Sequence, residues 1–106
     1  MKLFLTNRYG KYDAVAEYNA RTKEFVVLKG SHVSDSISTA PTFRGANEIK
    51  KRRKMYVMNN IVQEDVVFKS SSTAGNFVTG NSTDGPGSWK NENGKKLKVI
   101  LAELKE

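Results

Sequence analysis

The chain has 106 residues, which suits a single domain over positions 1–106 and leaves no room for a second one of ordinary size. Hydrophobic residues make up 38% and charged residues 27%, so the chain has enough apolar material for one modest core and is not disordered by composition. It contains no cysteine, which excludes disulfide bonds, thiolate zinc sites and cysteine nucleophiles.

Basic residues outnumber acidic ones by 18 to 11, which gives a formal net charge of +7. A surplus of this size favours polyanionic partners: nucleic acid, an anionic lipid surface or an acidic protein face. The apolar run Leu3–Leu5 is too short for the core of a secretory signal, and no stretch approaches the length of a membrane span. We therefore expect a cytoplasmic protein with no membrane partner.

The first part of the chain has the pattern of strands. Weak alternation of apolar and polar residues over 2–7 indicates one strand. Stronger patterns at 13–18 and 25–29 flank the polar stretch 19–23, and together these segments predict a β-hairpin. The Ser- and Thr-rich stretch 31–42 is typical of a loop.

A helix is expected in the middle of the chain. It begins at Phe43, with Thr42 as its N-cap, and ends near Asn59–Asn60. Its apolar side chains fall near one face, with Arg52 or Arg53 filling the gap between them: Ala46, Ile49, Tyr56 and Val57. The spacing therefore predicts a helix with one side on the core and the other in solvent.

The second half of the chain alternates between strand and helix signals. Val66–Phe68 is a short apolar run typical of a strand, and Ser70–Ser72 offer N-caps for a helix that ends at Gly80. A Gly- and Asn-rich loop is expected over 81–88. The last segment has the spacing of an amphipathic helix, through Leu97, Ile100, Leu101 and Leu104.

These elements mix strands and helices without the regular alternation of a βαβ protein. The order therefore predicts the α+β class. We expect a small single domain with a β-hairpin or small antiparallel sheet and about three helices.

The most conspicuous feature is a run of five basic residues within the middle helix: Lys50, Lys51, Arg52, Arg53 and Lys54. At about 100° per residue, five consecutive side chains wrap more than one turn and cannot share a face. Arg52 or Arg53, in line with Ile49 and Tyr56, is expected to turn toward the core and extend its alkyl stem along it. The others form a cationic collar, which either contacts phosphate or is simply a solvated helix face.

Other residues are candidates for the same interface. Ser70, Ser71 and Ser72 offer hydroxyls and free N–H groups to an anion, although serines at a helix start usually serve as caps. Trp89 is the only tryptophan, and it either stacks on a base or, by default, packs in the core. Two further residues complete the predicted nucleic-acid contacts: Asn76 and Lys90.

The sequence predicts no catalytic residue, metal or cofactor, and we do not expect an enzyme. His32 is the only histidine, and Glu64–Asp65 is the only adjacent pair of carboxylates. Glu92 and Lys95 flank a glycine turn rather than lying on a strand, which is not the pattern of a metal-dependent nuclease. The glycines match neither a phosphate-binding loop nor a dinucleotide-binding loop.

Three motifs in order resemble one bacterial family. Residues 25–31 (FVVLKGS) resemble the strand and VLKGS signature of the family known as domain of unknown function 4357. Residues 68–80 resemble its helix entry and 81–97 its WK and GK.L ending, so the likeness runs from about Tyr12 to Leu101. The chain departs from the family pattern at three places: Ser71 in place of proline, Gly75 in place of alanine, and a longer loop over 82–87.

The resemblance implies an accessory domain of DNA-processing proteins, often joined to nuclease domains of the GIY-YIG type. It also implies a distant similarity to the RAMA module, which is associated with restriction enzymes and adenine methylases and thought to read DNA. We therefore expect a non-catalytic accessory domain that binds DNA or another nucleic acid. The alternative is a protein-interaction or scaffold module with a nuclease or methylase partner. The choice of DNA or RNA and the oligomeric state stay open.

Overall fold

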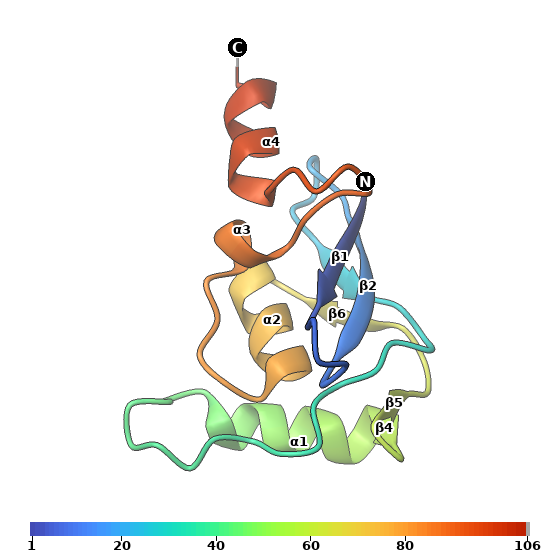
Figure 1. Ribbon diagram of the computed structural model, residues 1–106, viewed down its shortest axis with the longest axis vertical. Coiled ribbons are helices and arrows are strands. Elements are labelled where there is room, and N and C mark those ends of the chain that lie inside the picture. Colours follow the sequence, from blue (N-terminus) through green and yellow to red (C-terminus); the bar gives the residue numbers. More distant parts are fainter. Residues whose placement is uncertain (106) are drawn as a thin grey trace.

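A four-stranded antiparallel sheet with one helix packed on its inner face forms the centre of the molecule (Figure 1). The computed structural model describes residues 1–105, so position 106 of the predicted domain lies outside the described residues. The strand order is β1-β2-β3-β6, with bounds β1 (Lys2–Thr6), β2 (Asp13–Tyr18), β3 (Phe25–Val27) and β6 (Val66–Phe68). A separate hairpin pairs β4 (Val57–Met58) with β5 (Ile61–Val62). The helices are α1 (Ala46–Tyr56), α2 (Ser71–Thr79), α3 (Gly85–Ser88) and α4 (Leu97–Leu104). The predicted α+β class is confirmed.

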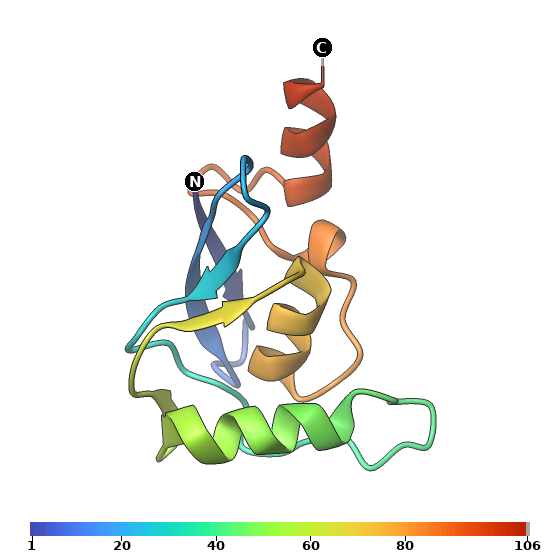
Figure 2. The same cartoon turned by 180° about the vertical axis from the view of Figure 1, so that it is seen from behind.

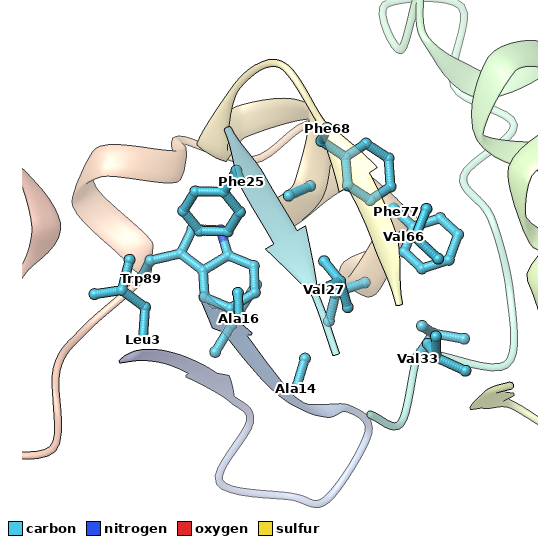
Figure 3. Close-up of a cluster of buried hydrophobic side chains, with 14 of the residues drawn as sticks. Leu3, Ala14, Ala16, Phe25, Val27, Val33, Val66, Phe68, Phe77 and Trp89 are labelled. Carbon is cyan, nitrogen blue, oxygen red and sulfur yellow. The ribbon is translucent and has the colours of Figure 1, made fainter. Parts of the chain in front are cut away.

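The core lies between the inward face of the sheet and α2. Alternate residues of each strand point inward and are buried: Leu3, Leu5, Ala14, Ala16, Phe25, Val27, Val66 and Phe68. From the other side α2 contributes Ala74, Phe77 and Val78. The two alanines of β2 are the small members of this layer, which also contains large aromatic rings, and Figure 3 shows the ring of Trp89 beside Ala16. Trp89 is one of these rings, packed edge-on against Phe25 at 4.9 Å between ring centroids.

The helix α1 begins three residues later than predicted, at Ala46 instead of Phe43. Phe43 is buried in the core, and its backbone N–H closes a turn on the carbonyl of Ala40 at 3.0 Å. The predicted cap Thr42 therefore lies inside this turn and not at the start of the helix. The helix starts instead after Gly45, whose carbonyl accepts from the Ile49 N–H at 3.1 Å. Burial of the phenylalanine ring decided where the helix begins.

A β-hairpin that the sequence analysis did not predict follows directly after α1. The chain leaves the helix after Tyr56, and Val57 pairs with Val62 across the β4–β5 hairpin. Asn59 and Asn60 form its turn with φ of 52° and 63°, and two successive left-handed residues are the signature of a type I′ hairpin turn. Asparagine is the non-glycine residue that tolerates this conformation best. The helix therefore ends at Tyr56, before the asparagines, which instead reverse the chain between the two short strands.

The helices α2 and α4 start where they were expected. Ser70 caps α2 by accepting from the Thr73 N–H at 3.1 Å, and Gly80, with φ of 76°, provides the left-handed C-cap. The predicted loop over 81–88 contains the single helical turn α3, capped by the Asp84 side chain on the Gly87 N–H. The predicted strand over 25–29 ends at Val27.

The helix α4 projects from the body of the molecule and contacts it mainly through α3 (Figures 1 and 2). Its first residue, Leu97, is buried, whereas Leu104 near its end is 60% exposed. None of the helices in the described part of the chain combines the length and the apolar character needed to cross a bilayer.

Candidate nucleic-acid interface

The basic run of α1 is divided between solvent and the body of the protein. Lys50, Lys51 and Lys54 are exposed, whereas Arg52 and Arg53 are half-buried. Because the helix turns about 100° per residue, the three lysines lie about 100°, 200° and 140° around its axis from buried Ile49. They therefore share an arc of about 100° on the outer side of α1. We call this set, Lys50, Lys51 and Lys54, the lysine face.

Arg53 fastens α1 to the end of α2 and to the segment before α1. Its Nε donates to the carbonyl of Phe77 at 2.9 Å, and one Nη2 bond reaches the carbonyl of Val78 at 3.2 Å. Its other bonds go to Ser34: Nη1 to the carbonyl at 2.8 Å and Nη2 to Oγ at 3.0 Å. Phe77 and Val78 belong to the last turn of α2, whose carbonyls have no partner within their own helix. The guanidinium therefore serves as a side-chain cap for α2.

Burial has an electrostatic cost for Arg53. Removal from water lowers the pKa of its guanidinium to about 10, and the nearby negative charge of Asp35 partly opposes this shift. The group stays protonated at neutral pH. It is stabilised there by the four hydrogen bonds from its three nitrogens, all of which go to oxygen acceptors.

Arg52 fastens the other side of α1 to the sheet. Its Nη1 donates to the carbonyl of Val67 at 3.0 Å, and its guanidinium carbon lies 4.8 Å from the centre of the Phe68 ring. Figure 2 shows β6 above this part of α1. The prediction that Arg52 or Arg53 turns inward is confirmed, and in fact both do. The two arginines hold α1 on separate elements, which fixes the direction of the lysine face.

The charges of the lysine face are not neutralised by neighbouring acids. The ion pairs within residues 1–105 join the amino group of Met1 to Glu17 and Lys95 to Glu103. Within that range, therefore, the three lysines have no carboxylate within 4.0 Å. Solvent-exposed, unpaired ammonium groups on one side of a fixed helix are available to an external anion.

The N-terminus of α2 is used for internal contacts. The Ser70 hydroxyl caps the helix, the carbonyl of Ser71 accepts from Trp89 Nε1 at 3.0 Å, and Ser72 Oγ accepts from the Gly85 N–H at 3.1 Å. Gly85 lies so close that a Cβ there would collide with the backbone of both Ser71 and Ser72. The contacts support the capping interpretation of these serines, because α3 covers the helix end where an anion was predicted to bind.

Trp89 is a core residue, with 0% of its surface exposed. Its ring cannot stack on a base without leaving the core, so the base-stacking interpretation is wrong for this conformation and the default one is confirmed. Asn76 is half-buried, and its Oδ1 accepts from the Thr83 N–H at 2.8 Å, which holds the loop after α2. Lys90 extends the β1 edge through backbone bonds with Phe4 at 2.7 and 3.0 Å, and its side chain is exposed.

A second region, which the sequence reading missed, is an open groove of about 1260 Å³. Its walls come from four separated segments, parts of 5–12, 32–36, 59–60 and 79–88, together with Lys90 and Lys96. In Figure 1 the β1–β2 turn, the β4–β5 turn and the loop after α2 all lie at the end of the molecule nearest α1. None of these segments carries a binding motif, and each shows only residues typical of turns. The sequence alone therefore did not predict this cavity. We call this cavity the groove.

The residues considered for catalysis do not come together. His32 is exposed on the groove wall, and the carboxylate of Asp65 accepts from the Lys29 N–H at 2.8 Å in a structural contact. Within residues 1–105 no cluster of three or more histidine, aspartate or glutamate side chains is arranged to hold a metal ion.

The comparisons with known proteins identify a family. No curated protein and no solved structure matches the chain significantly. A family profile, described as Domain of unknown function (DUF4357), matches residues 5–101, which run from the end of β1 into α4. The resemblance drawn from the three motifs, which began at about Tyr12, is thereby confirmed and extended. The chain belongs to the family described as Domain of unknown function (DUF4357).

Proposed function

We propose that this protein is a non-catalytic nucleic-acid-binding module of the cytoplasm that contacts the phosphate backbone of DNA through the lysine face. The observation that carries the proposal is the division of the basic run. Arg52 and Arg53 hold α1 in place, and the three lysines beside them stay exposed and unpaired within the described residues. A rigid cationic ridge of this kind suits phosphate contacts, which position a protein on a duplex without reading its sequence.

The net charge supports the same proposal. At +7 the whole protein attracts a polyanion from a distance, and the lysine face gives that attraction a defined point of contact. The family resemblance, which implies DNA-processing partners, is consistent with DNA as the nucleic acid. An accessory domain that holds a duplex for a partner enzyme needs no catalytic residue of its own.

The direct test is charge reversal of the lysine face. In the variant Lys50→Glu, Lys51→Glu and Lys54→Glu, affinity for a labelled duplex is expected to fall at least a hundredfold at low salt, measured by fluorescence anisotropy. The matched control is Lys2→Glu, Lys23→Glu and Lys98→Glu, in exposed residues away from α1. Both variants lower the net charge by six, from +7 to +1, so overall attraction falls equally.

The comparison of these two variants separates contact from bulk charge. If the control weakens binding as much as the lysine-face variant, the lysine face is not the contact surface. If the unmodified protein does not bind a duplex at low salt, the proposal fails altogether. Circular dichroism of both variants, unchanged from the parent, shows that a loss of binding is not a loss of fold.

A protein-interaction module is the second candidate. The observation that favours it is a set of exposed apolar side chains close to the lysine face along the chain: Met55, 71% exposed, and Met58, 63% exposed. Exposed methionines adapt well to partner surfaces. Coprecipitation with a nuclease or methylase that survives charge reversal of the lysine face, but is lost in Met55→Ser with Met58→Ser, would favour this candidate.

A further inference from the structure

We propose that the groove receives one unpaired nucleobase with its attached phosphate, so that the protein binds bases as well as backbone. This inference rests on the proposed function, because it assigns a second contact to the same nucleic acid. It is carried by hydrogen-bonding groups without partners, by an exposed aromatic ring and by cations at the rim of the groove.

The hydrogen-bonding groups come from two turns that face the groove. Asn59 and Asn60 form the β4–β5 turn, and Asn81 and Ser82 begin the loop after α2. Across residues 1–105 the side chains of these four residues make no hydrogen bond. An asparagine amide presents a donor and an acceptor side by side, which matches the edge of a nucleobase.

The floor of the groove, by contrast, is already satisfied. The Ser34 hydroxyl donates toward the carbonyls of Ser36 and Thr79 at 2.9 and 2.7 Å, and its Oγ accepts from Arg53 Nη2 at 3.0 Å. A ligand would therefore find a fixed polar floor and free amides on the walls. Because the floor is bonded to Arg53, the groove is supported by the same helix that carries the lysine face.

An aromatic side chain stands at the rim. Tyr9 is 76% exposed, and the guanidinium carbon of Arg8 lies 5.9 Å from the centre of its ring. The turn that carries it is well ordered by Asn7, which accepts from the N–H groups of Tyr9 and Gly10 at 2.7 and 2.9 Å. An exposed ring on a fixed turn is a stacking platform, and such stacking typically raises affinity roughly tenfold per base.

Cations on the same walls suit the phosphate that accompanies a base. Lys11, Lys90 and Lys96 line the groove, against Asp35 and Asp84. The three lysines outnumber the two aspartates, so the net charge of the walls is positive. Positive charge together with a ring and free amides favours a nucleotide over an uncharged sugar or a cationic ligand.

The size of the groove indicates a polymer rather than an enclosed metabolite. Clefts that hold small ligands usually measure about 300–1,000 Å³ and surround most of the ligand. The groove, at about 1260 Å³, is larger and is open to solvent. An unpaired base of a longer strand fits such a shape, because the strand itself needs an open path on either side.

The test uses a groove variant that preserves the fold. Asn60→Gly keeps the left-handed turn residue while removing its amide, and Tyr9→Ala and Asn81→Ala remove the ring and a second amide. Two matched controls are Tyr9→Phe, which keeps the stacking ring, and Asn93→Ala, an exposed asparagine outside the groove. Equal melting temperatures for all variants establish that the fold is retained.

Four probes are compared by anisotropy: a single-stranded oligonucleotide, a fully paired duplex, a duplex with one bulged base, and adenosine monophosphate as a competitor. The groove variant is expected to bind the single strand and the bulged duplex at least tenfold more weakly than the parent, with paired-duplex affinity unchanged within twofold. Displacement of the strand by millimolar adenosine monophosphate would identify a free nucleotide as sufficient. Resistance to it would identify the strand as the ligand.

The outcomes separate the two proposals. If the groove variant binds the single strand and the bulged duplex as tightly as the parent, the groove proposal is overturned, while duplex binding lost on charge reversal of the lysine face still supports the proposed function. If Tyr9→Phe weakens binding as much as Tyr9→Ala, the ring does not act by stacking and that part of the proposal is overturned.

Discussion

The lysine face and the N-terminus of α2 were both predicted to contact phosphate, and the fold treats them in opposite ways. The lysines lie on the outer side of α1, where no described element covers them. At the start of α2, Ser71 and Ser72 lie against α3, and the Ser70 hydroxyl, the Ser71 carbonyl and the Ser72 hydroxyl all accept hydrogen bonds from within the fold. A basic run and the start of a helix can both be recognised from the local sequence. Whether a ligand can reach them depends on which later segment of the chain folds over them.

The same difference divides the basic run itself. Adjacent basic residues have different roles, because each residue is rotated by about 100° around the helix axis. This rotation turns Arg52 toward β6 and Arg53 toward α2. Arginine suits these inward positions, since its planar group reaches several carbonyls at once, whereas lysine offers a compact and strongly hydrated charge. Four sets of substitutions test these two differences, from the largest expected effect on stability to the smallest.

Removal of the Arg53 guanidinium is expected to be the most damaging. Arg53→Ala deletes four hydrogen bonds and leaves acceptors at Ser34, Phe77 and Val78 without partners. The free energy of unfolding is expected to fall by about 2–4 kcal/mol, measured by urea denaturation. Lys54→Ala, one residue further on the same helix, is the control. A change below about 0.5 kcal/mol in Arg53→Ala would show that the guanidinium does not hold the helices together.

The contact between α3 and the start of α2 can be tested through a glycine. In Gly85→Ala the new methyl group would meet the backbone of Ser71 and Ser72, so the two elements must separate. The free energy of unfolding is expected to fall by about 1–3 kcal/mol. Gly45→Ala is the matched control, because its methyl group would have no neighbour nearer than 3.8 Å. Equal stability of the two variants would mean that α3 does not cover the end of α2 tightly.

The role of Ser70 distinguishes a cap from an anion site. Ser70→Ala removes the acceptor of the Thr73 N–H, so stability is expected to fall by about 1 kcal/mol. Affinity for a paired duplex is expected to stay the same within twofold. A large loss of affinity with little loss of stability would contradict the capping interpretation. It would show that the start of α2 contacts phosphate.

Single lysines of the lysine face are expected to matter least for stability. Lys50→Ala, Lys51→Ala and Lys54→Ala should each change the free energy of unfolding by less than about 0.5 kcal/mol, because these side chains are exposed and unpaired within the described residues. Each should nevertheless weaken duplex binding. A destabilisation comparable to that of Arg53→Ala would mean that the lysines, too, are structural.

Much of the fold was readable because its signals are local. Alternation in β2 and β3, the serine cap of α2, Gly80 at its end and the apolar spacing of α4 each lie within one segment. The start of α1 was misplaced because tertiary burial of Phe43 outweighed a good cap at Thr42. The β4–β5 hairpin was missed because its strands have two residues each, although Asn59–Asn60 between apolar residues was a usable turn signal.

The candidate site was predictable only where it is continuous in sequence. The basic run indicated the lysine face, and helix geometry predicted that an arginine turns inward. The groove was not predictable, because its walls come from four segments that only the fold brings together. Trp89 also shows why sequence alone was not sufficient. A single tryptophan near a glycine-rich loop is compatible with both a core position and a binding surface, and only its burial in the structure distinguishes them.

The division of the basic run is tested most directly by the salt dependence of duplex binding. Each phosphate neutralised contributes about −0.9 to the slope of log affinity against log salt, so the three lysines alone predict a slope of about −2.7. Each single lysine-to-alanine variant should bring that slope about 0.9 closer to zero. A slope near −4.5, the value for roughly five contacts, would mean that the arginines also leave the protein to bind phosphate. A slope near zero would contradict phosphate contact by the lysine face.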